Sequence, residues 1–130
     1  MRYAELAKLY RYEKSGELSG LERVRSFTLA DAHIIARKTQ AADEINNVLD
    51  LIDYTAQALG LKLGEDYWYR LSLGDRDDSK KYFKDDASWD NAENVLREVL
   101  IKRGAKFTEA EKEAAFYGPK IDIMVVDAIG

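Results

Sequence analysis

The sequence predicts an α+β fold in which an antiparallel sheet with a long hairpin is flanked by helices. Residues 23–36 alternate with a period of two, as a long strand does: the even positions carry small or apolar side chains, and most of the odd positions carry charged or aromatic ones. Residues 40–59 and 88–103 instead carry apolar side chains at helical spacing. A short strand-like run follows each of these two segments. Strands and helices mixed in this way along one chain are typical of an α+β or mixed α/β architecture.

The hairpin is the first predicted element. Residues 2–12 mix aromatic and charged side chains and fit no single pattern. The run KSGELSG at 14–20 holds two glycines and two serines, which indicates a loop. After it, the alternation predicts a strand from Arg23 to Ala36. We expect Tyr10–Glu13 to be its antiparallel partner across the loop.

The middle of the chain is predicted to form a helix, a strand and a polar loop. The helix spans Gln40–Leu59, and Gly60 supplies its C-terminal stop. The run YWYRLSL at 67–73 is rich in aromatic residues and predicts a strand. Residues 74–86 are charged and predict a loop, with Tyr82 and Phe83 as its apolar anchors.

The last third is predicted to be a helix followed by strands. Ser88 is the expected N-cap of a helix that runs to Arg103 and is closed by Gly104. Glu113 begins a strand-like stretch that turns at Gly118-Pro119 and resumes as a strand over 120–126. Glu109 and its acidic neighbours are expected to lie on the surface.

Composition limits the function classes that remain. The chain has 130 residues, which predicts a single domain over 1–130. Its formal net charge of −4 argues against a general clamp for nucleic-acid backbone. It has no cysteine, which excludes disulfides and cysteine-containing metal cages. No apolar stretch approaches the roughly 20 residues that span a bilayer, and no signal peptide opens the chain, so we expect a cytoplasmic protein without membrane contact.

Chemistry concentrates on the predicted hairpin. Side chains two apart on a strand share a face, so Arg11 and Glu13 project together. On the long strand, the residues that share one parity are Arg23, Phe27, Asp31 and His33. Guanidinium groups grip phosphate and carboxylate, and a phenyl ring offers a surface on which a base can stack. An aligned register therefore predicts a site for a nucleotide triphosphate or an acid substrate.

Plainer interpretations of these residues remain open. An Arg and a Glu on one strand face usually form a solvated ion pair. A lone Phe is more often a core residue, and a lone His more often a structural one, because a zinc site needs three or four ligands. The coincidence of these groups on one parity favours the site. No phosphate-binding glycine loop and no nucleophile elbow is present.

The order of these residues resembles a known family. R-x-E at 11–13, SGELSGLERVRSF at 15–27 and DAHI at 31–34 are similar to motif 2 of class II aminoacyl-tRNA synthetases. MRYAE at the start, DNAENVLREVL at 90–100 and AFYGPKIDIMVVDAIG at 115–130 resemble the threonine-specific enzymes of that class. The resemblance spans essentially the whole chain and implies part of a class II synthetase catalytic fold.

The resemblance implies an ATP site on the hairpin. Arg11 would contact the α-phosphate of ATP and the amino-acid carboxylate, which makes it the catalytic residue. Glu13 would read the adenine amine or the terminal adenosine of the tRNA. Arg23 would hold the outer phosphates, and Phe27 would stack on the adenine. ATP with Mg²⁺ is the implied cosubstrate.

The resemblance also implies a threonine site. Asp31 would accept a hydrogen bond from the threonine hydroxyl, Tyr117 would contact its amino group, and Lys120 would belong to the same pocket. His33 would be one ligand of the zinc ion that binds threonine in this family. The loop at 14–22 would meet the acceptor end of tRNA(Thr), and the whole enzyme would be a homodimer.

The sequence departs from the family pattern in two places. The family usually has FTQDDAH where this chain has FTLADAH at 27–33, so Leu29 replaces an amide. The zinc site also needs a Cys and a second His, and this chain has no Cys and one His. Met1 is followed directly by sequence that looks structured, and the chain stops at Gly130 just after a hydrophobic strand. We therefore expect a fragment of a catalytic core that is inactive alone and does not retain zinc.

An alternative from a different class is a free-standing, noncatalytic relative that binds a nucleotide or a partner protein. Leu29 and Ala30 fit this alternative better than they fit a working enzyme.

Overall fold

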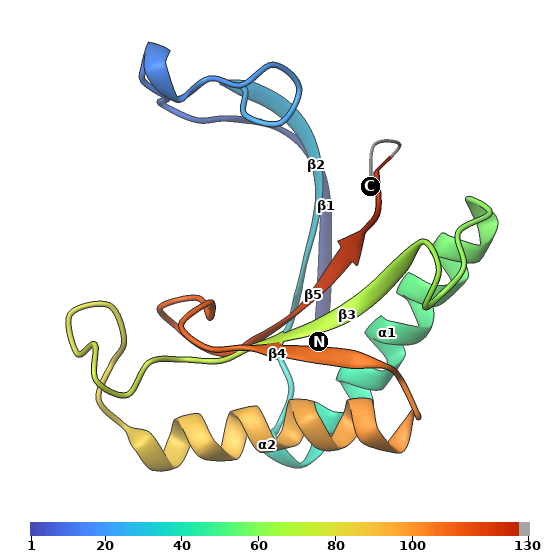
Figure 1. The fold of residues 1–130 in the computed structure, drawn as a ribbon, viewed down its shortest axis with the longest axis vertical. Coiled ribbons are helices and arrows are strands. Elements are labelled where there is room, and N and C mark those ends of the chain that lie inside the picture. The colour runs from blue at the N-terminus through green and yellow to red at the C-terminus, as the bar shows by residue number, and fades with distance from the viewer. Residues whose placement is uncertain (128–130) are drawn as a thin grey trace. The chain divides into compact units, whose positions relative to one another are not determined.

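The structure, a computed structural model, describes residues 1–127 and divides into two compact units (Figure 1). The first unit is Met1–Arg37 and the second is Lys38–Gly130. The final three residues of the AFYGPKIDIMVVDAIG motif lie outside the described residues. Strands and helices are both present, as the predicted α+β class requires.

The first unit is the predicted hairpin, with a different partner strand. β1 (Arg2–Tyr10) pairs antiparallel with β2 (Ser26–Ile34), and Arg2 lies opposite Ile34. The partner strand was expected at Tyr10–Glu13, and these bounds are wrong, because β1 lies earlier in the chain and includes only Tyr10 of that segment. The pairing continues one step beyond the ladder, where the Arg11 amide donates to the Arg25 carbonyl at 2.9 Å.

The cause of this error lies in the composition of β1. Neither face of β1 is uniformly apolar, because Leu6 and Lys8 share one parity and Glu5 and Leu9 share the other. Within residues 1–37, all of which the structure describes, Glu13 is the only buried residue. No core therefore imposes a hydrophobic alternation that the sequence would reveal.

Two helices of the second unit lie close to their predicted positions. α1 (Ala41–Ala58) follows a short 3-10 turn at Lys38–Gln40 and ends before Gly60, whose φ of 79° is the left-handed conformation of a helix stop. α2 (Asp86–Lys102) begins three residues earlier than a helix capped by Ser88 would begin.

The expected N-cap of α2, Ser88, is wrong. Asp85 is the N-cap, and its carboxylate accepts a hydrogen bond from the Ser88 backbone amide at 3.2 Å. An acidic side chain at this position also meets the positive end of the helix dipole. Gly104, with φ of 63°, follows the C-terminal end as predicted.

The second unit also contains a three-stranded sheet in the order β4-β3-β5. β3 (Tyr67–Ser72) pairs antiparallel with β5 (Lys120–Val125), close to the predicted bounds of both strands. β4 (Phe107–Ala110) pairs parallel with β3 and was not predicted, so the sheet is mixed rather than antiparallel. The strand expected from Glu113 is wrong, because residues 111–119 form turns and an isolated bridge.

The core fills the space between this sheet and the two helices. β3 turns Tyr67, Tyr69 and Leu71 to the helical side, and all three are buried. β5 contributes Ile121 and Ile123 to the same side. Both helices therefore cover one face of the sheet (Figure 1). The buried members of this core are Leu49, Ala56, Tyr67, Tyr69, Leu71, Val99 and Leu100.

A smaller cluster holds the charged loop at 74–86 against the start of α2. Tyr82, one of the two predicted anchors, is buried against Trp89 and Ala114, and its hydroxyl donates to the Lys112 carbonyl at 2.9 Å. Phe83, the other predicted anchor, is largely exposed, so that prediction is wrong. No helix within residues 1–127 is long and apolar enough to cross a membrane.

Candidate functional site

The hairpin brings two of the predicted ATP-site residues into stacking contact. Phe27 lies opposite Leu9 in the ladder, so the side chain of Arg11, two residues further along, emerges on the same face. The Arg11 guanidinium carbon lies 4.8 Å from the centre of the Phe27 ring, a cation–π contact. A base that stacks on that side of the ring has to displace the guanidinium.

The other two predicted ATP-site residues form an ion pair just beyond the end of the ladder. The Arg23 Nε atom lies 3.2 Å from the Glu13 Oε2 atom. The Glu13 side chain is only 6% exposed, whereas the Arg23 side chain is more than half exposed. Arg25, which was not predicted, donates from Nε to the Glu13 carbonyl at 3.0 Å. Two arginines thus fix one residue, through its side chain and through its backbone.

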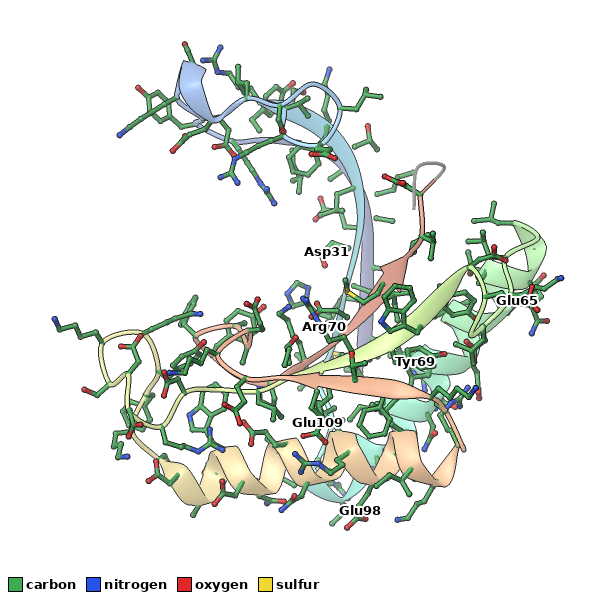
Figure 2. All side chains as sticks on the ribbon, viewed as in Figure 1. Asp31, Glu65, Tyr69, Arg70, Glu98 and Glu109 are labelled. Atoms are coloured by element: carbon green, nitrogen blue, oxygen red, sulfur yellow. The ribbon has the colours of Figure 1, made fainter. Side chains whose placement is uncertain are left out.

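Asp31 and His33 lie further along the same parity of β2. Asp31 is opposite Glu5 and His33 is opposite Tyr3 (Figure 2 labels Asp31). The His33 Nδ1 atom is 3.9 Å from the Asp31 Oδ2 atom, and both side chains are largely exposed. Leu29, between Phe27 and Asp31 on this parity, lies opposite Ala7.

These residues do not fit a zinc centre by themselves. The sequence holds one His and no Cys. In the part of the chain that the structure describes, no three His, Cys, Asp or Glu residues are grouped so that they could hold a metal ion. A protein zinc site needs at least three such ligands. His33 would therefore need ligands from outside residues 1–127 to hold zinc.

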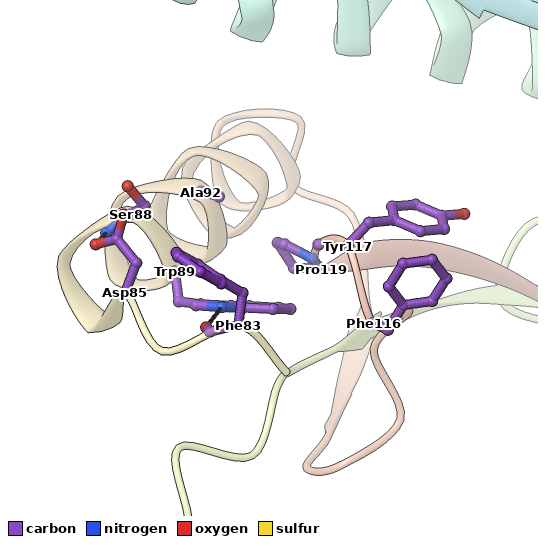
Figure 3. A pocket seen from close by; sticks show the side chains of 9 residues that line it. Phe83, Asp85, Ser88, Trp89, Ala92, Phe116, Tyr117 and Pro119 are labelled. Carbon is purple, nitrogen blue, oxygen red and sulfur yellow. Dashed lines mark hydrogen bonds between the residues drawn. The ribbon is translucent and has the colours of Figure 1, made fainter. Parts of the chain in front are cut away.

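The remaining predicted residues, Tyr117 and Lys120, belong to the second unit. Tyr117 is exposed and lines a pocket of about 290 Å³ together with Phe83, Trp89, Phe116 and Pro119 (Figure 3). The Trp89 indole in this pocket donates to the Phe83 carbonyl at 3.0 Å. The Tyr117 and Phe116 rings meet edge to face, with their centres 5.1 Å apart.

Lys120 opens β5 and contacts a carboxylate that was not predicted. Its Nζ atom lies 2.6 Å from Oδ1 and 2.7 Å from Oδ2 of Asp122. Burial alone would raise the pKa of Asp122, but hydrogen bonds from Lys120, Ser72 and Arg70 outweigh it and lower that pKa below its ordinary value. Asp122 is therefore a carboxylate at neutral pH.

The sequence indicates the strand face on which Asp122 and its partners lie, but not that they meet. In the run KIDI, polar residues occupy even positions and isoleucines occupy odd ones, and YRLS has the same alternation in β3. That pattern places Arg70, Ser72, Lys120 and Asp122 on one face and the apolar residues on the other. The missing information was the pairing of β3 with β5, two segments about fifty residues apart.

Comparisons with known proteins agree with the fold and with the order of these residues. The family model for the class II core domain of tRNA synthetases (G, H, P, S and T) matches residues 1–130, and the chain belongs to that family.

Its relatives include threonine–tRNA ligases. The chain is 45% identical to threonine–tRNA ligase of Clostridium perfringens and 48% identical to threonine–tRNA ligase 1 of Bacillus subtilis, in both cases over all 130 residues. It spans 20% of the length of each of these relatives. A crystal structure of the RNA binding domain of threonyl-tRNA synthetase from Cryptosporidium parvum superimposes with a TM-score of 0.85 at 36% identity, covering 99% of this chain and 30% of that one.

Proposed function

We propose that residues 1–130 form the motif 2 part of the catalytic core of a threonine-specific aminoacyl-tRNA synthetase. The whole enzyme would form threonyl adenylate from threonine and ATP, with release of pyrophosphate, and then transfer the threonyl group to tRNA(Thr), in the cytoplasm and as a homodimer. The observation that supports this proposal is the cluster of Arg11, Glu13, Arg23 and Phe27 at the end of one hairpin, in a chain that matches the family over its whole length.

The first chemical step needs charge neutralisation rather than a protein nucleophile. A carboxylate oxygen of threonine attacks the α-phosphorus of ATP, the bond to the β-phosphate oxygen breaks, and pyrophosphate leaves. Arg11 would stabilise the negative charge that develops on the α-phosphate, and it would hold the carboxylate in line for attack. ATP enters this reaction with Mg²⁺, which the family implies.

The contacts within the chain define what ATP must replace. Arg23 is paired with Glu13, so binding of the outer phosphates by Arg23 competes with that ion pair. Adenine on Phe27 competes with Arg11, whose guanidinium would then turn to the α-phosphate. Arg25 keeps its hold on the Glu13 carbonyl, so the Glu13 backbone stays in place to present its side chain to the adenine amine.

Asp31, Tyr117 and Lys120 would contribute to threonine binding. In the second step, a hydroxyl of the terminal ribose of tRNA(Thr) attacks the threonyl carbonyl carbon and AMP leaves. Residues 14–22 would meet the acceptor end of the tRNA.

The test uses a complete enzyme, because the chain spans 20% of its relatives. Residues 1–130 replace the matching segment of threonine–tRNA ligase 1 of Bacillus subtilis, and threonine-dependent exchange of pyrophosphate into ATP is measured. We expect exchange by this chimera. Arg11→Ala should lower its rate about 100-fold to 1,000-fold, the usual cost of removing one preorganised charge contact.

The matched control is Lys8→Ala, which removes a cation from the opposite parity of β1 and should change the rate less than about threefold. An Arg11→Ala rate close to that of the unmodified chimera would contradict the role of Arg11. A folded, soluble chimera without exchange would favour the noncatalytic alternative, for which Leu29 in place of the family's amide is the specific observation.

A further inference from the structure

A two-by-two block of polar residues occupies the face of the β3–β5 pair that is turned away from the helices. Arg70 lies directly opposite Asp122, and Ser72 lies directly opposite Lys120. Residues two apart on a strand share a face, so all four side chains emerge together. Their neighbours of the other parity, such as Leu71 and Ile121, enter the core.

Asp122 is the common partner of this block. Its Oδ2 atom accepts from the Ser72 hydroxyl at 2.6 Å and from Nη2 of Arg70 at 3.1 Å. Ser72 is completely buried, so its hydroxyl cannot exchange this partner for water. The position of the carboxylate is therefore set by a rigid group beneath it and a guanidinium beside it.

Lys120 is held by the same carboxylate from the other side. Its ammonium group spans both oxygens of Asp122, and Oδ1 takes no hydrogen bond from Arg70 or Ser72. A lysine side chain is flexible, and an ammonium carries three donors. Because Nζ lies between the two oxygens of Asp122, the side of the ammonium group that is left for a ligand faces away from this carboxylate. The Lys120 side chain remains 38% exposed, which leaves room for a ligand.

Charge makes this arrangement attractive to an anion. Arg70 and Lys120 bring two positive charges to a single carboxylate, so the block keeps one net positive charge. An anionic oxygen that approaches Lys120 meets a positive site with a donor already oriented.

We propose that Asp122 is a positioning residue that orients the Lys120 ammonium toward an anionic oxygen of the substrate, either the threonine carboxylate or a phosphate of ATP. The proposal rests on the proposed function, because it assumes that Lys120 contacts substrate. Asp122 itself touches no substrate and acts through Lys120.

Asp122→Asn separates this role from a structural one. An amide oxygen in place of Oδ2 keeps the hydrogen bonds from Ser72 and Arg70. An amide nitrogen in place of Oδ1 faces the ammonium as a second donor, so Lys120 loses one of its two acceptors and the charge of its partner, and keeps only a contact with the neutral amide oxygen. The control is Glu109→Gln on the same sheet, which removes a carboxylate paired with Arg97 at 2.7 Å, on α2.

The first measurement uses the 130-residue chain without ligand. Proton–nitrogen NMR spectra of the lysine ammonium groups are recorded, and Lys120→Arg assigns the signal of Lys120. We expect Asp122→Asn to remove or broaden this signal and Glu109→Gln to preserve it. A Lys120 signal that Asp122→Asn leaves unchanged would overturn the positioning role, whatever the outcome for the proposed function.

The second measurement uses pyrophosphate exchange by the chimera. We expect Asp122→Asn to raise the KM for either threonine or ATP about tenfold, and Lys120→Met to raise the same KM at least as much. A rise in the KM for threonine identifies the carboxylate as the ligand, and a rise in the KM for ATP identifies a phosphate.

The double variant provides the decisive comparison. If Asp122 acts through Lys120, then Asp122→Asn adds nothing in the Lys120→Met background. Additive effects would overturn the proposal, as would an equal KM change in Glu109→Gln. If the NMR result holds but neither Lys120→Met nor Arg11→Ala changes exchange, the proposed function fails while the contact between Asp122 and Lys120 stands.

Discussion

Asp53 is a single carboxylate that joins three elements of the second unit. It lies on α1 and accepts hydrogen bonds from the hydroxyls of Tyr67 and Tyr69 on β3. It also receives Nη2 of Arg103, at the C-terminal end of α2, at 2.8 Å. The two tyrosines are core residues, so Asp53 satisfies polar groups that the core would otherwise leave without a partner.

We predict that Asp53→Asn lowers the free energy of unfolding by about 2 kcal/mol, because hydrogen bonds to a charged group are lost from a largely buried place. Asp50→Asn is the matched control. Asp50 pairs with the same arginine at 2.6 Å, but its side chain is 66% exposed against 21% for Asp53, so its loss should cost less than about 1 kcal/mol. Urea denaturation of both variants measures their free energies of unfolding. Equal losses of stability would contradict the conclusion that Asp53 stabilises the unit more than Asp50 does.

At the scale of single residues, periodicity predicted which side chains share a face of one strand, but not which side chains contact each other across the hairpin. The period of two placed Arg11 with Glu13, and separately Phe27 with Asp31, because geometry alone fixes that relation along one strand. It could not reveal that Arg11 stacks on Phe27, or that Arg25 holds the Glu13 backbone, because these contacts depend on the register between the strands.

At the scale of elements, the charged loop at 74–86 is ordered by its contacts with α2. The Arg76 guanidinium lies 5.3 Å from the Trp89 ring centre and pairs with the largely buried Glu93 at 2.8 Å. Glu93 also accepts from the Gly74 amide at 3.0 Å. A Cβ atom at Gly74 would lie 2.9 Å from two carbons of the Trp89 ring, so only glycine fits there without movement.

We predict that Gly74→Ala destabilises the chain by about 1–3 kcal/mol, the usual cost of overpacking a filled site. The added methyl group pushes against a rigid indole that is fixed by its hydrogen bond to Phe83. Thermal unfolding followed by Trp fluorescence measures the effect. Gly16→Ala is the control, because a Cβ at Gly16 meets nothing within 4 Å, and it should be nearly neutral. A neutral Gly74→Ala would show that α2 can yield at Trp89.

Elements with an apolar stripe were predicted well, and elements without one were not. α1 and α2 bury one side each, so their spacing is visible in the sequence. β4 has four residues and a single large apolar one, Phe107, so its acidic neighbours suggested only surface. Ser88 was a reasonable cap by residue type, but Asp85, three residues earlier, also has a side chain that can cap.

At the scale of the whole chain, the two units are stabilised in different ways. The second unit has a hydrophobic core between a sheet and two helices. The first is a two-stranded hairpin in which, across residues 1–37, only Glu13 is buried. A hairpin of this kind has little burial of its own to stabilise it. The prediction of one domain depended on length alone. Length carries no information on how buried residues are distributed along the chain.

The core also predicts how stability depends on alkaline pH. Burial, followed by hydrogen bonding to Asp53, raises the pKa of Tyr67 from 10.0 to about 12 and raises the pKa of Tyr69 further. The unfolded chain therefore loses these phenolic protons first. The stabilisation is complete below pH 10. The contribution of Tyr67 is lost progressively as the pH rises from about 10 to 12, and the loss of the Tyr69 contribution continues at higher pH.

Unfolding by urea at several values of pH above 9 measures this dependence. We expect the free energy of unfolding to fall over this interval, and Tyr67→Phe to make the fall shallower by roughly one bound proton. Absorbance at 295 nm during titration provides an independent measure of phenol ionisation. An unchanged slope in Tyr67→Phe would contradict the raised pKa of Tyr67.

The opposite chemistry of the two faces of the β3–β5 pair protects the alignment of the strands. A shift of β5 by one residue would expose Ile121 to solvent. It would also bury the charged groups of Lys120 and Asp122 in the core, next to the tyrosine rings of β3. Such a slip is costly, so the register of β3 and β5 is strongly specified. It also follows that single-residue insertions and deletions should be tolerated in the turn before Lys120 but rejected within the strand itself.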